Sequence, residues 1–326
     1  MKRNVALKAS GLLTVAFTLV VALWAAIAQA QPLITCNNAS LDGGGPITTY
    51  DFNGGAIVGS FVPTGGFTGQ NGRGVEVIGN KVYYTELTLP NAPTDFIRIA
   101  PFNGGAGGAD IGTLPNPRPG VGIQDLTFSS GVLYVLTGYP FDTPQVFGLN
   151  PLTGAVVIGP ITISAPAATD SDGFTVLPNG NFIINEGDDS CTYDQYDPST
   201  GVVIPSTTLV VPGCTAPLGP GTGATGVETD GISLFFETNF DSFTNTTLAG
   251  TLIASQAVPV NECEDISLDQ PGCIGAAGAT PGAKDCHGAC VSFLAKADGG
   301  LKKAAKDLGY ASVAALQDAV KAFCGK

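Results

Sequence analysis

The chain has 326 residues and a net charge of −13, and 13% of its residues are charged. An acidic chain repels phosphate backbones, which argues against a nucleic-acid partner. Its only histidine, His287, lies near the C-terminal end, so the rest of the chain cannot form a Ser-His-Asp triad or a histidine-ligated zinc site.

Residues 1–30 are predicted to be a secretory signal peptide. Basic residues near the start precede an apolar run over 11–27 and then Ala28-Gln29-Ala30, the small-x-small pattern of a cleavage site. An uncleaved anchor is the alternative, but the run is short for a bilayer span. Cleavage leaves 11 basic and 27 acidic residues, a net charge of −16. We expect an extracellular or periplasmic protein with no membrane span after cleavage.

Residues 31–270 contain a repeat of about fifty residues. The stretch Phe-Asn-Gly-Gly-Ala occurs at 52–56 and again at 102–106, and three looser relatives follow. The last glycines of these five stretches are Gly55, Gly105, Gly154, Gly201 and Gly250. Each lies between two short β-branched or aromatic runs, which predicts a hairpin turn with a glycine at positive φ.

A second pattern lies between these turns: a small or acidic stretch, a glycine turn and then an apolar strand. It recurs at 74–85, 122–136, 172–185 and 225–237. In the second unit the predicted strands are 124–128, 132–136, 146–149 and 156–162. Four antiparallel strands per fifty residues are typical of a β-propeller blade. A pair of immunoglobulin-like sandwiches is the rival fold, but its repeat would be near one hundred residues.

The two ends of this region complement each other. The N-terminal part supplies strands at 33–36, 47–52 and 56–62 but no inner strand, and residues 264–268 form an inner strand with nothing after it. Joining them completes a fifth blade and closes the ring. Cys36 and Cys263 would then lie on neighbouring strands, which predicts a disulfide between them. Cys191 and Cys214, within one blade, are the second predicted pair.

The strand-turn-strand rhythm over residues 33–268 resembles that of exported propellers of the NHL, YVTN-repeat and gluconolactonase-like groups. The resemblance rests on turn glycines and strand rhythm, not on a catalytic motif. It implies a propeller architecture and no particular activity.

The C-terminal part is different. Residues 271–284 are predicted to be a Gly/Ala/Pro linker and 285–326 a helical tail, with helices at 289–297, 300–308 and 313–323 and Ser312 as an N-cap. Residues 286–324 resemble short helical tails of other exported bacterial proteins, which implies no activity. The C-terminal part contains four cysteines, Cys273, Cys286, Cys290 and Cys324. Its predicted helices include the lysines Lys302, Lys303, Lys306 and Lys321.

We expect the tail cysteines to form disulfides, with their pairing open, in preference to a metal site around Cys286-His287-Gly288-Ala289-Cys290. The lysines are interpreted first as a solvated helix face. Docking on an acidic partner, or on the acidic body itself, is the alternative.

Carboxylates are the remaining candidates for chemistry. One acid per blade is predicted near the channel: Glu76, Asp125, Asp172, Glu228 and Asp265. A second group lies within one blade: Asp170, Asp172, Glu186, Asp188 and Asp189. Oxygen-rich loops of this kind suit Ca²⁺. The simpler interpretation is that these acids accept hydrogen bonds from backbone amides in turns.

The sequence therefore favours an exported propeller that acts as a binding or interaction module for a protein or glycan, with Ca²⁺ as a candidate supporting ion. The alternative is a metal-dependent hydrolase that cleaves a glycan or lactone with the channel carboxylates. Five-bladed glycosidases use inner-strand carboxylates in this way, and the resemblance to them is one of architecture. No catalytic residue is assigned, and whether the protein is an enzyme stays open.

Overall fold

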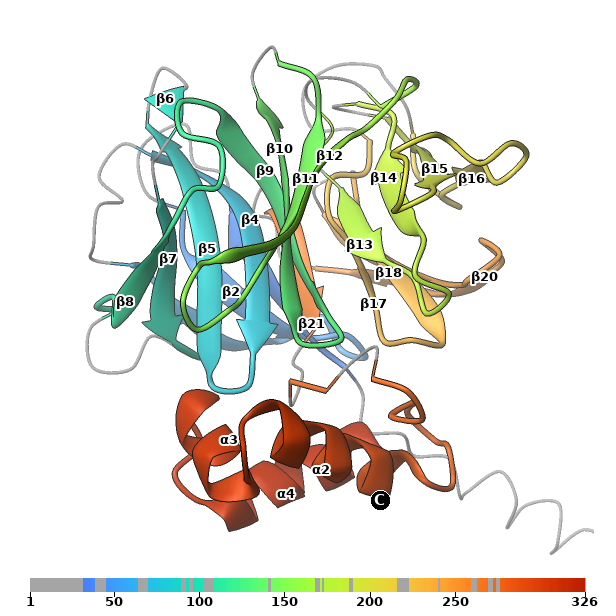
Figure 1. Cartoon of the computed structure of the whole chain (residues 1–326). Coiled ribbons are helices and arrows are strands. Elements are labelled where there is room, and N and C mark those ends of the chain that lie inside the picture. Colours follow the sequence, from blue (N-terminus) through green and yellow to red (C-terminus); the bar gives the residue numbers. More distant parts are fainter. Residues whose placement is uncertain are drawn as a thin grey trace, which may run out of the picture.

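A computed structural model describes residues 32–325, except 39–44, 64–69, 89–91, 94–95, 103–107, 140–141, 168–170, 172, 188–189, 216–222, 240, 259–262, 269–271 and 274–275. These residues form a five-bladed β-propeller and three C-terminal helices (Figure 1). The predicted signal peptide lies outside the described residues. Among those described, no helix is long and apolar enough to cross a membrane.

Each blade is an antiparallel sheet whose strands follow one another from the axis outward. Blade 1 contains β4 (Gln70–Ile78), β5 (Lys81–Thr88), β7 (Phe96–Pro101) and β8 (Gly112–Pro115), with β6 (Ala92–Pro93) paired to β5. Blade 2 contains β9 (Gly122–Ser129), β10 (Val132–Tyr139), β11 (Gln145–Leu149) and β12 (Val156–Thr162). Blade 3 contains β13 (Phe174–Val176), β14 (Phe182–Asn185), β15 (Thr192–Tyr196) and β16 (Leu209–Val210). Blade 4 contains β17 (Val227–Thr229), β18 (Ser233–Thr238), β19 (Ser242–Thr247) and β20 (Leu252–Ala257).

Blade 5 is assembled from both ends of the described chain. Its order is β21 (Cys263–Leu268), β1 (Leu33–Asn38), β2 (Ile47–Asp51) and β3 (Ile57–Phe61). The ladder between β1 and β21 pairs Ile34 with Leu268 and Asn38 with Cys263. The predicted disulfide Cys36–Cys263 crosses this seam. The five-bladed ring and its closure by the terminal strands are confirmed, and the immunoglobulin-like alternative is wrong.

The core lies between neighbouring blades. Ile97 of blade 1, for example, belongs to the same buried cluster as Leu126 and Val135 of blade 2. Inner and central strands are covered on both faces by adjacent blades, so their residues are buried nearly without interruption, whereas β12 and β20 are mostly exposed. This decrease in burial from the inner to the outer strands explains why the inner and central strands appear as apolar runs in the sequence.

The turns between the third and fourth strands lie at the rim, and their glycines have positive φ as predicted at Gly55, Gly154, Gly201 and Gly250. Gly105 lies outside the described residues. Each of the four described turns touches the outer strand, or the residue next to it, of the preceding blade. A Cβ built on Gly201 would lie 2.0 Å from the carbonyl oxygen of Thr162. The rim glycines therefore permit a close approach between blades as well as a turn.

The C-terminal helices form a small module with its own core. They are α2 (Cys286–Ala297), α3 (Leu301–Asp307) and α4 (Val313–Phe323). Ser312 caps α4 as predicted, because its side chain accepts a hydrogen bond from the Ala315 amide. The disulfides are Cys273–Cys290 and Cys286–Cys324, and the segment around Ala276 and Ala279 packs into the same core.

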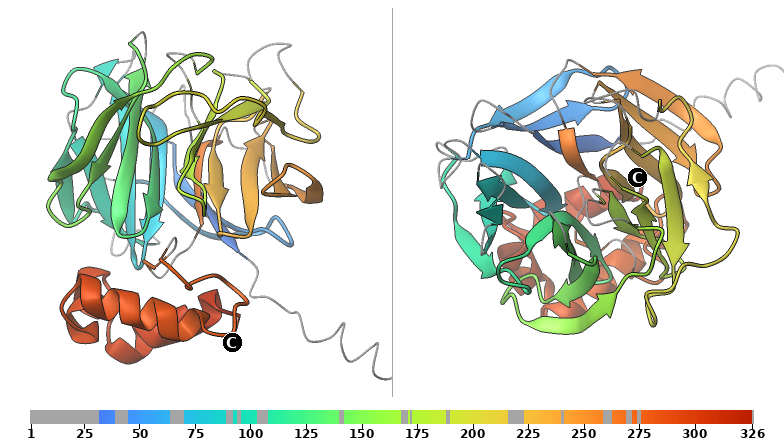
Figure 2. Two further views of the ribbon diagram at one scale, coloured as in Figure 1. Left: turned by 45° about the vertical axis from the view of Figure 1, so that its right-hand side comes forward. Right: turned by 90° about the horizontal axis from the view of Figure 1, so that it is seen from above.

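This helical module lies against one end of the propeller, as the side views in Figures 1 and 2 show. We call this end the hairpin face, because the β4–β5 and β9–β10 turns lie there. The Asn80 amide donates to the Leu308 carbonyl at 2.8 Å, and Lys81 Nζ donates to the Asp307 carbonyl at 2.5 Å. Leu308 and Phe323 also pack against the apolar cluster between blades 1 and 2.

Two of the tail lysines pair within the module, Lys303 with Asp307 and Lys321 with Asp318. Lys81 of the propeller is a lysine that lies at the junction itself. We call the opposite end of the ring, where β5, β10, β14 and β18 end, the loop face.

Replacing Gly79 by alanine is expected to weaken this docking. Its φ is +65°, and a Cβ there would lie 2.6 Å from the Leu308 carbonyl oxygen. Gly231→Ala is the matched control, since Gly231 occupies the corresponding turn of blade 4 with φ +88° and nothing within 4 Å. We expect faster hydrogen exchange at the Asn80 amide and faster proteolysis between propeller and module in G79A only. Equal exchange in both variants would show that the contact at Gly79 does not hold the module.

Candidate functional site

The inner strands direct two layers of side chains at the propeller axis. The register places Glu76, Thr127, Thr175, Glu228 and Ser267 in one layer, which we call the glutamate layer. The aspartate layer lies two residues earlier in the chain, on the inner strands or directly before them, and consists of Gly74, Asp125, Gly173, Gly226 and Asp265. Figure 2, right, shows these inner strands around the centre of the ring.

Glycine fills three positions of the aspartate layer because the strands approach closely there. A Cβ on Gly226 would lie 2.5 Å from the Ile266 amide nitrogen, and one on Gly74 would lie 3.0 Å from the backbone of Asp125. The two aspartates of this layer contact each other across the axis. They come from blades 2 and 5, which are not neighbours in the ring.

Each aspartate also joins its blade to the next one. Asp265 Oδ2 accepts the Val75 amide of blade 1 at 2.6 Å, and its Oδ1 accepts the Ile266 amide at 2.7 Å. Asp125 Oδ2 accepts the Phe174 amide of blade 3 at 2.5 Å. The simpler prediction, that acids accept backbone amides, therefore describes part of their role, although the Val75 and Phe174 amides belong to neighbouring strands instead of turns.

Hydroxyl groups surround one of the two glutamates in the other layer. Thr175 Oγ1 donates to Glu228 Oε1 at 2.8 Å, and Thr127 Oγ1 donates to Glu228 Oε2 at 3.1 Å. The Thr229 amide donates to Glu228 Oε1 at 2.6 Å. Glu76 contacts the Glu228 carboxyl, and the Ser267 hydroxyl lies close enough to lower the pKa of Glu76, but among the described residues neither Glu76 oxygen has a donor in good hydrogen-bond geometry.

All four carboxyls are buried, with 0–1% of each residue exposed. Burial raises the pKa of Asp125, Asp265 and Glu76 well above the ordinary range. Burial also raises the pKa of Glu228 to about 7, although the hydrogen bonds from Thr229 and Thr175 act in the opposite direction. The repulsion among the four acids adds to the effect of burial. Each of these groups therefore holds a proton more readily than an exposed carboxyl does.

The mouth of the channel on the loop face carries an ordered arginine. Arg73 Nη1 donates to Glu264 Oε2 at 2.8 Å, and its guanidinium carbon lies 4.6 Å from the centre of the Tyr139 ring. The side chains of Arg73 and Glu264 are only 9% and 12% exposed. A guanidinium that is both ion-paired and stacked keeps a fixed orientation.

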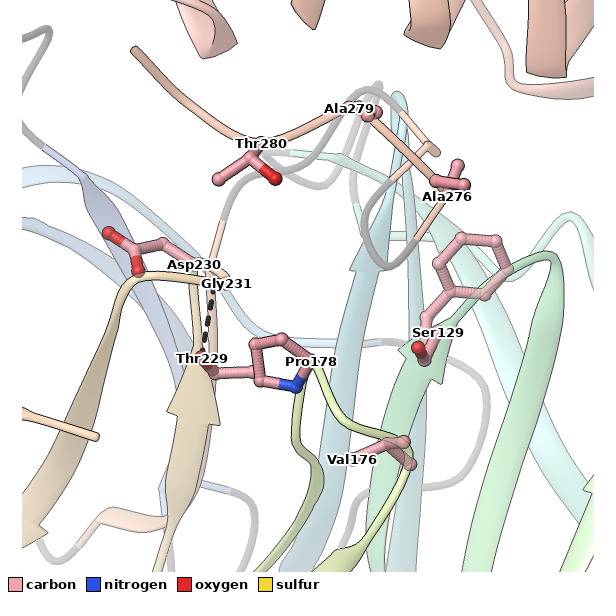
Figure 3. A pocket seen from close by; sticks show the side chains of 12 residues that line it. Ser129, Val176, Pro178, Thr229, Asp230, Gly231, Ala276, Ala279 and Thr280 are labelled. Atoms are coloured by element: carbon pink, nitrogen blue, oxygen red, sulfur yellow. Dashed lines mark hydrogen bonds between the residues drawn. The ribbon is translucent and has the colours of Figure 1, made fainter. Parts of the chain in front are cut away.

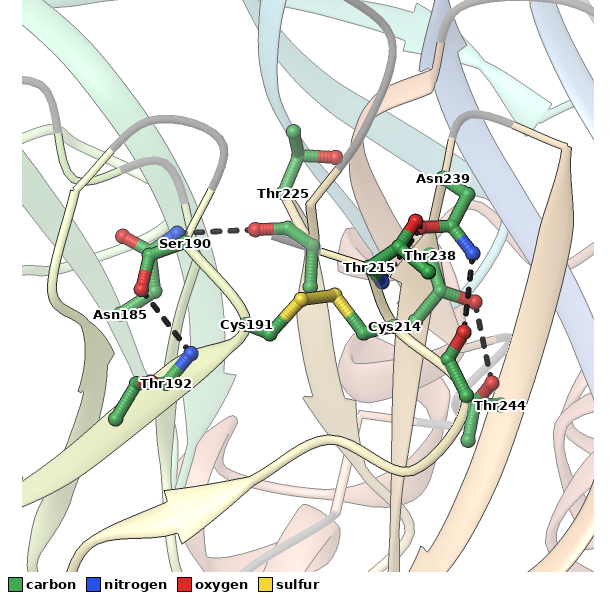
Figure 4. The surroundings of a disulfide bond; sticks show 12 residues. Asn185, Ser190, Cys191, Thr192, Cys214, Thr215, Thr225, Thr238, Asn239 and Thr244 are labelled. Atoms are coloured by element: carbon green, nitrogen blue, oxygen red, sulfur yellow. Dashed lines mark hydrogen bonds between the residues drawn. A yellow bond between two sulfur atoms is a disulfide. The ribbon is translucent and has the colours of Figure 1, made fainter. Parts of the chain in front are cut away.

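The loop face is also reinforced by the disulfide Cys191–Cys214, which was predicted correctly. Next to it, Asn239 of blade 4 reaches across to blade 3 (Figure 4). Its Oδ1 accepts hydrogen bonds from the amide and hydroxyl of Thr215, and its Nδ2 donates to the Gly213 carbonyl. Loops of two blades are thereby tied together beside the channel.

A pocket of about 160 Å³ lies on the opposite side, between residues 276–280 and the hairpin turns of blades 2, 3 and 4 (Figure 3). Asp230 is the acid in its lining. The Asp230 Oδ1 accepts the amides of Ile232 and Ser233, so this carboxylate is used within its own turn. We assign no ligand to this pocket.

The second group of predicted acids is only partly described. Asp170, Asp172, Asp188 and Asp189 lie outside the described residues. Glu186 lies beside Asp194, and burial together with this neighbour raises the pKa of Glu186. Within the described part of the chain, no group of three or more His, Cys, Asp or Glu residues is arranged to hold a metal ion. All four tail cysteines form disulfides, which removes them as metal ligands.

Sequence reasoning missed several groups at the axis and the mouth. The partners of the acids, Thr127, Thr175 and Ser267, follow from the two-residue period of the inner strands and could have been found by aligning the five strands. The Arg73–Glu264–Tyr139 cluster has no such signal, because its members come from positions 191 residues apart and from a third strand.

No protein-family model and no curated protein sequence matches this chain. Solved structures with a similar fold include a protein of unknown function from Bacteroides caccae, with a TM-score of 0.46 and 10% identity over 73% of this chain and 98% of that one. A glutaminyl cyclase from Myxococcus xanthus has a TM-score of 0.42 and 12% identity over 71% of this chain and 100% of that one. The computationally designed Ika8 protein has a TM-score of 0.35 and 13% identity over 70% and 60% of the two chains.

Proposed function

We propose that this protein is an exported binding module that presents the loop face of a disulfide-latched propeller to a protein or glycan ligand. Four disulfides support an oxidising compartment, outside the cytoplasm. Extracellular or periplasmic location is part of the proposal, because it depends on residues 1–30. The likeness to NHL, YVTN-repeat and gluconolactonase-like propellers concerns the propeller architecture alone and supports no particular activity.

Two features support the loop face as the binding surface. The helical module lies on the hairpin face, so a ligand approaching the ring from that side meets the module first. On the loop face, the loops of blades 3 and 4 are held by Cys191–Cys214 and by the hydrogen bonds of Asn239. A rigid scaffold that carries loops at one end is a common arrangement for recognition.

The observation that carries the proposal is the clamped Arg73. Its guanidinium is oriented by Glu264 and by the partly exposed ring of Tyr139. The partly exposed ring of Tyr139, held in place by the largely buried Arg73 guanidinium, suits the apolar faces of sugars and the planar amides of peptides. The acidic body makes anionic polymers poor ligands.

The test uses residues 31–326 on a glycan array and on a panel of purified extracellular proteins from the same source. Tyr139→Ala should lower the affinity for any ligand found by about tenfold or more, because it removes the ring and frees the guanidinium. Lys303→Ala, on the exposed surface of the helical module, is the control and should bind normally. Binding that depends on Lys303 and not on Tyr139 would place recognition on the module and overturn the proposal.

Hydrolysis by the axial carboxyls is the alternative, and we do not adopt it. A substrate would have to reach groups that are at most 1% exposed, between layers already filled by threonines and close backbone contacts. No described residue offers an observation that favours this chemistry over binding.

The proposal includes a stabilising Ca²⁺ ion in blade 3 only. The paired carboxyls of Glu186 and Asp194 support it, since two adjacent acids repel each other unless a cation or proton lies between them. We expect calcium at 100 times its Kd to stabilise the protein by about 2.7 kcal/mol relative to chelator, seen as a higher melting temperature. Glu186→Gln should abolish the difference, and Asp241→Asn, a surface acid elsewhere, should keep it. Equal midpoints in calcium and chelator would remove calcium from the proposal.

A further inference from the structure

The four axial carboxyls form two pairs, and the members of each pair differ in their hydrogen bonds. Glu76 contacts Glu228 in the glutamate layer, and Asp125 contacts Asp265 in the aspartate layer. A contact between two carboxyls is attractive only when a proton or a cation lies between them. Among the described residues no group of three or more such acids is arranged to hold a metal ion, and the hydrogen-bond donors around each pair support a proton in this place.

The number of hydrogen-bond donors to each carboxyl identifies which member of each pair is ionised. Three donors converge on Glu228, from the Thr229 amide and the hydroxyls of Thr127 and Thr175. Both oxygens of Asp265 accept backbone amides, from Val75 and Ile266. A carboxylate that accepts several N–H and O–H bonds is stabilised in its charged form.

The other member of each pair has fewer donors. Among the described residues, neither oxygen of Glu76 has a donor in good hydrogen-bond geometry, although the Ser267 hydroxyl lies near it. Asp125 Oδ2 accepts the Phe174 amide, but Asp125 Oδ1 has no such donor. Both residues are fully buried. A buried carboxyl oxygen that faces only another carboxyl satisfies itself by carrying the proton and donating it to that neighbour.

We propose that the axis holds two protons at neutral pH, one on Glu76 shared with Glu228 and one on Asp125 shared with Asp265, and that alkaline pH removes them and loosens the ring. Loss of either proton leaves two adjacent charges on buried side chains. The repulsion acts between blades 1 and 4 in one layer and between blades 2 and 5 in the other. The two pairs thus connect four of the five blades.

The surroundings contain few other charges that would offset this effect. Blade 3 contributes Thr175 to the glutamate layer and Gly173 to the aspartate layer, both uncharged. From β1, the residue opposite Asp265 is Asn37. Arg73 and Glu264 lie at the mouth beside the aspartate layer, where they pair with each other. Asp172 lies outside the described residues.

The direction of the pH effect follows from proton linkage. These acids have raised pKa values in the folded protein and ordinary pKa values near 4 in the unfolded chain. At any pH between the unfolded and the folded pKa, the folded state therefore binds more protons than the unfolded state. Their contribution to stability is complete below about pH 4 and is lost as the pH rises through the folded pKa values. With two extra protons bound, the unfolding equilibrium constant should rise about 100-fold per pH unit within that window.

Isosteric amides provide a matched pair of tests. In Asp125→Asn and Glu76→Gln the new NH₂ replaces the proposed O–H donor, so the double variant should fold, lose most of the slope of stability against pH and exceed the wild type at pH 8. In Asp265→Asn the NH₂ must face the Val75 or Ile266 amide, so this variant should be destabilised at every pH. Asp285→Asn with Asp318→Asn removes two surface charges and should retain the wild-type slope, which separates the axis from general charge repulsion.

Infrared spectroscopy of the wild type gives an answer that does not depend on any variant folding. Buried protonated carboxyls should give a C=O stretching band that persists at pH 7 and disappears at alkaline pH. Absence of that band at pH 7, or a stability that is flat between pH 5 and 8, would overturn the proposal. So would recovery of stability at pH 8 on addition of calcium or sodium chloride in the wild type but not in the Glu76→Gln/Asp125→Asn variant, because a cation and not a proton would then lie between the acids.

Discussion

Replacing Cys36 and Cys263 by alanine should lower the free energy of unfolding by about 5 kcal/mol, the chain-entropy value for a loop of this length. The disulfide spans 227 residues and joins the first described strand of the ring to the last. Without it, β21 is held to β1 only by a short ladder. Denaturant unfolding under non-reducing conditions measures the loss, and hydrogen exchange at the Ile266 amide reports opening of blade 5.

The matched control for the Cys36–Cys263 disulfide is the double variant Cys191→Ala/Cys214→Ala. That disulfide closes a separation of 23 residues within blade 3, for which the same model gives about 3 kcal/mol. Exchange at Ile266 should stay slow in this control. The variant without Cys36–Cys263 could lose less free energy of unfolding than the variant without Cys191–Cys214. That result would mean that opening the long loop adds little entropy to the unfolded chain, and that the β1–β21 ladder alone closes the ring.

Gly201→Ala should destabilise the protein by about 3 kcal/mol, because it adds a methyl group where two blades meet at the rim. The built Cβ would lie 2.0 Å from the Thr162 carbonyl oxygen, and the same contact includes a hydrogen bond from the Ser164 amide to the Gly201 carbonyl. Since the obstacle is backbone, it cannot move aside as a flexible side chain would. Thermal or denaturant unfolding measures the effect.

Gly180→Ala is the control for the backbone conformation. Gly180 has φ +90°, less favourable for alanine than the +69° of Gly201, but nothing lies within 4 Å of its Cβ position. It should cost about 1 kcal/mol. If both variants lose the same stability, the cost at Gly201 comes from the turn alone and the contact between blades 2 and 3 contributes nothing.

The rim turns show what a local sequence pattern can predict and what it cannot. The glycine spacing predicts hairpins, and Gly55, Gly154, Gly201 and Gly250 have the positive φ that such turns require. Their second role, contact with the preceding blade, has no local signal. It depends on the distance between neighbouring sheets, which is set by the packing of side chains such as Leu126 and Ile97 between them.

The axial acids show the same division. One inner-strand acid per blade was predicted to point toward the channel, and the structure places Glu76, Asp125, Glu228 and Asp265 there. Their assignment to two layers, and the difference in hydrogen bonding between Glu228 and Glu76, depend on strand register across the ring. Register is a relation between strands 50 to 190 residues apart, and a count along one strand does not contain it.

By itself, the sequence determined the repeat, the number of blades, closure by the terminal strands, two disulfides and the capped last helix. These features follow from patterns of a few residues, namely glycine turns, two-residue alternation and a serine N-cap, or from counting repeats. Only the tertiary structure decided the pairing of the tail cysteines, the docking of the helical module through Leu308 and the partners of the buried acids. Those depend on which surfaces meet once the ring has closed, because burial and the need to satisfy every buried polar group act between segments that the chain order keeps far apart.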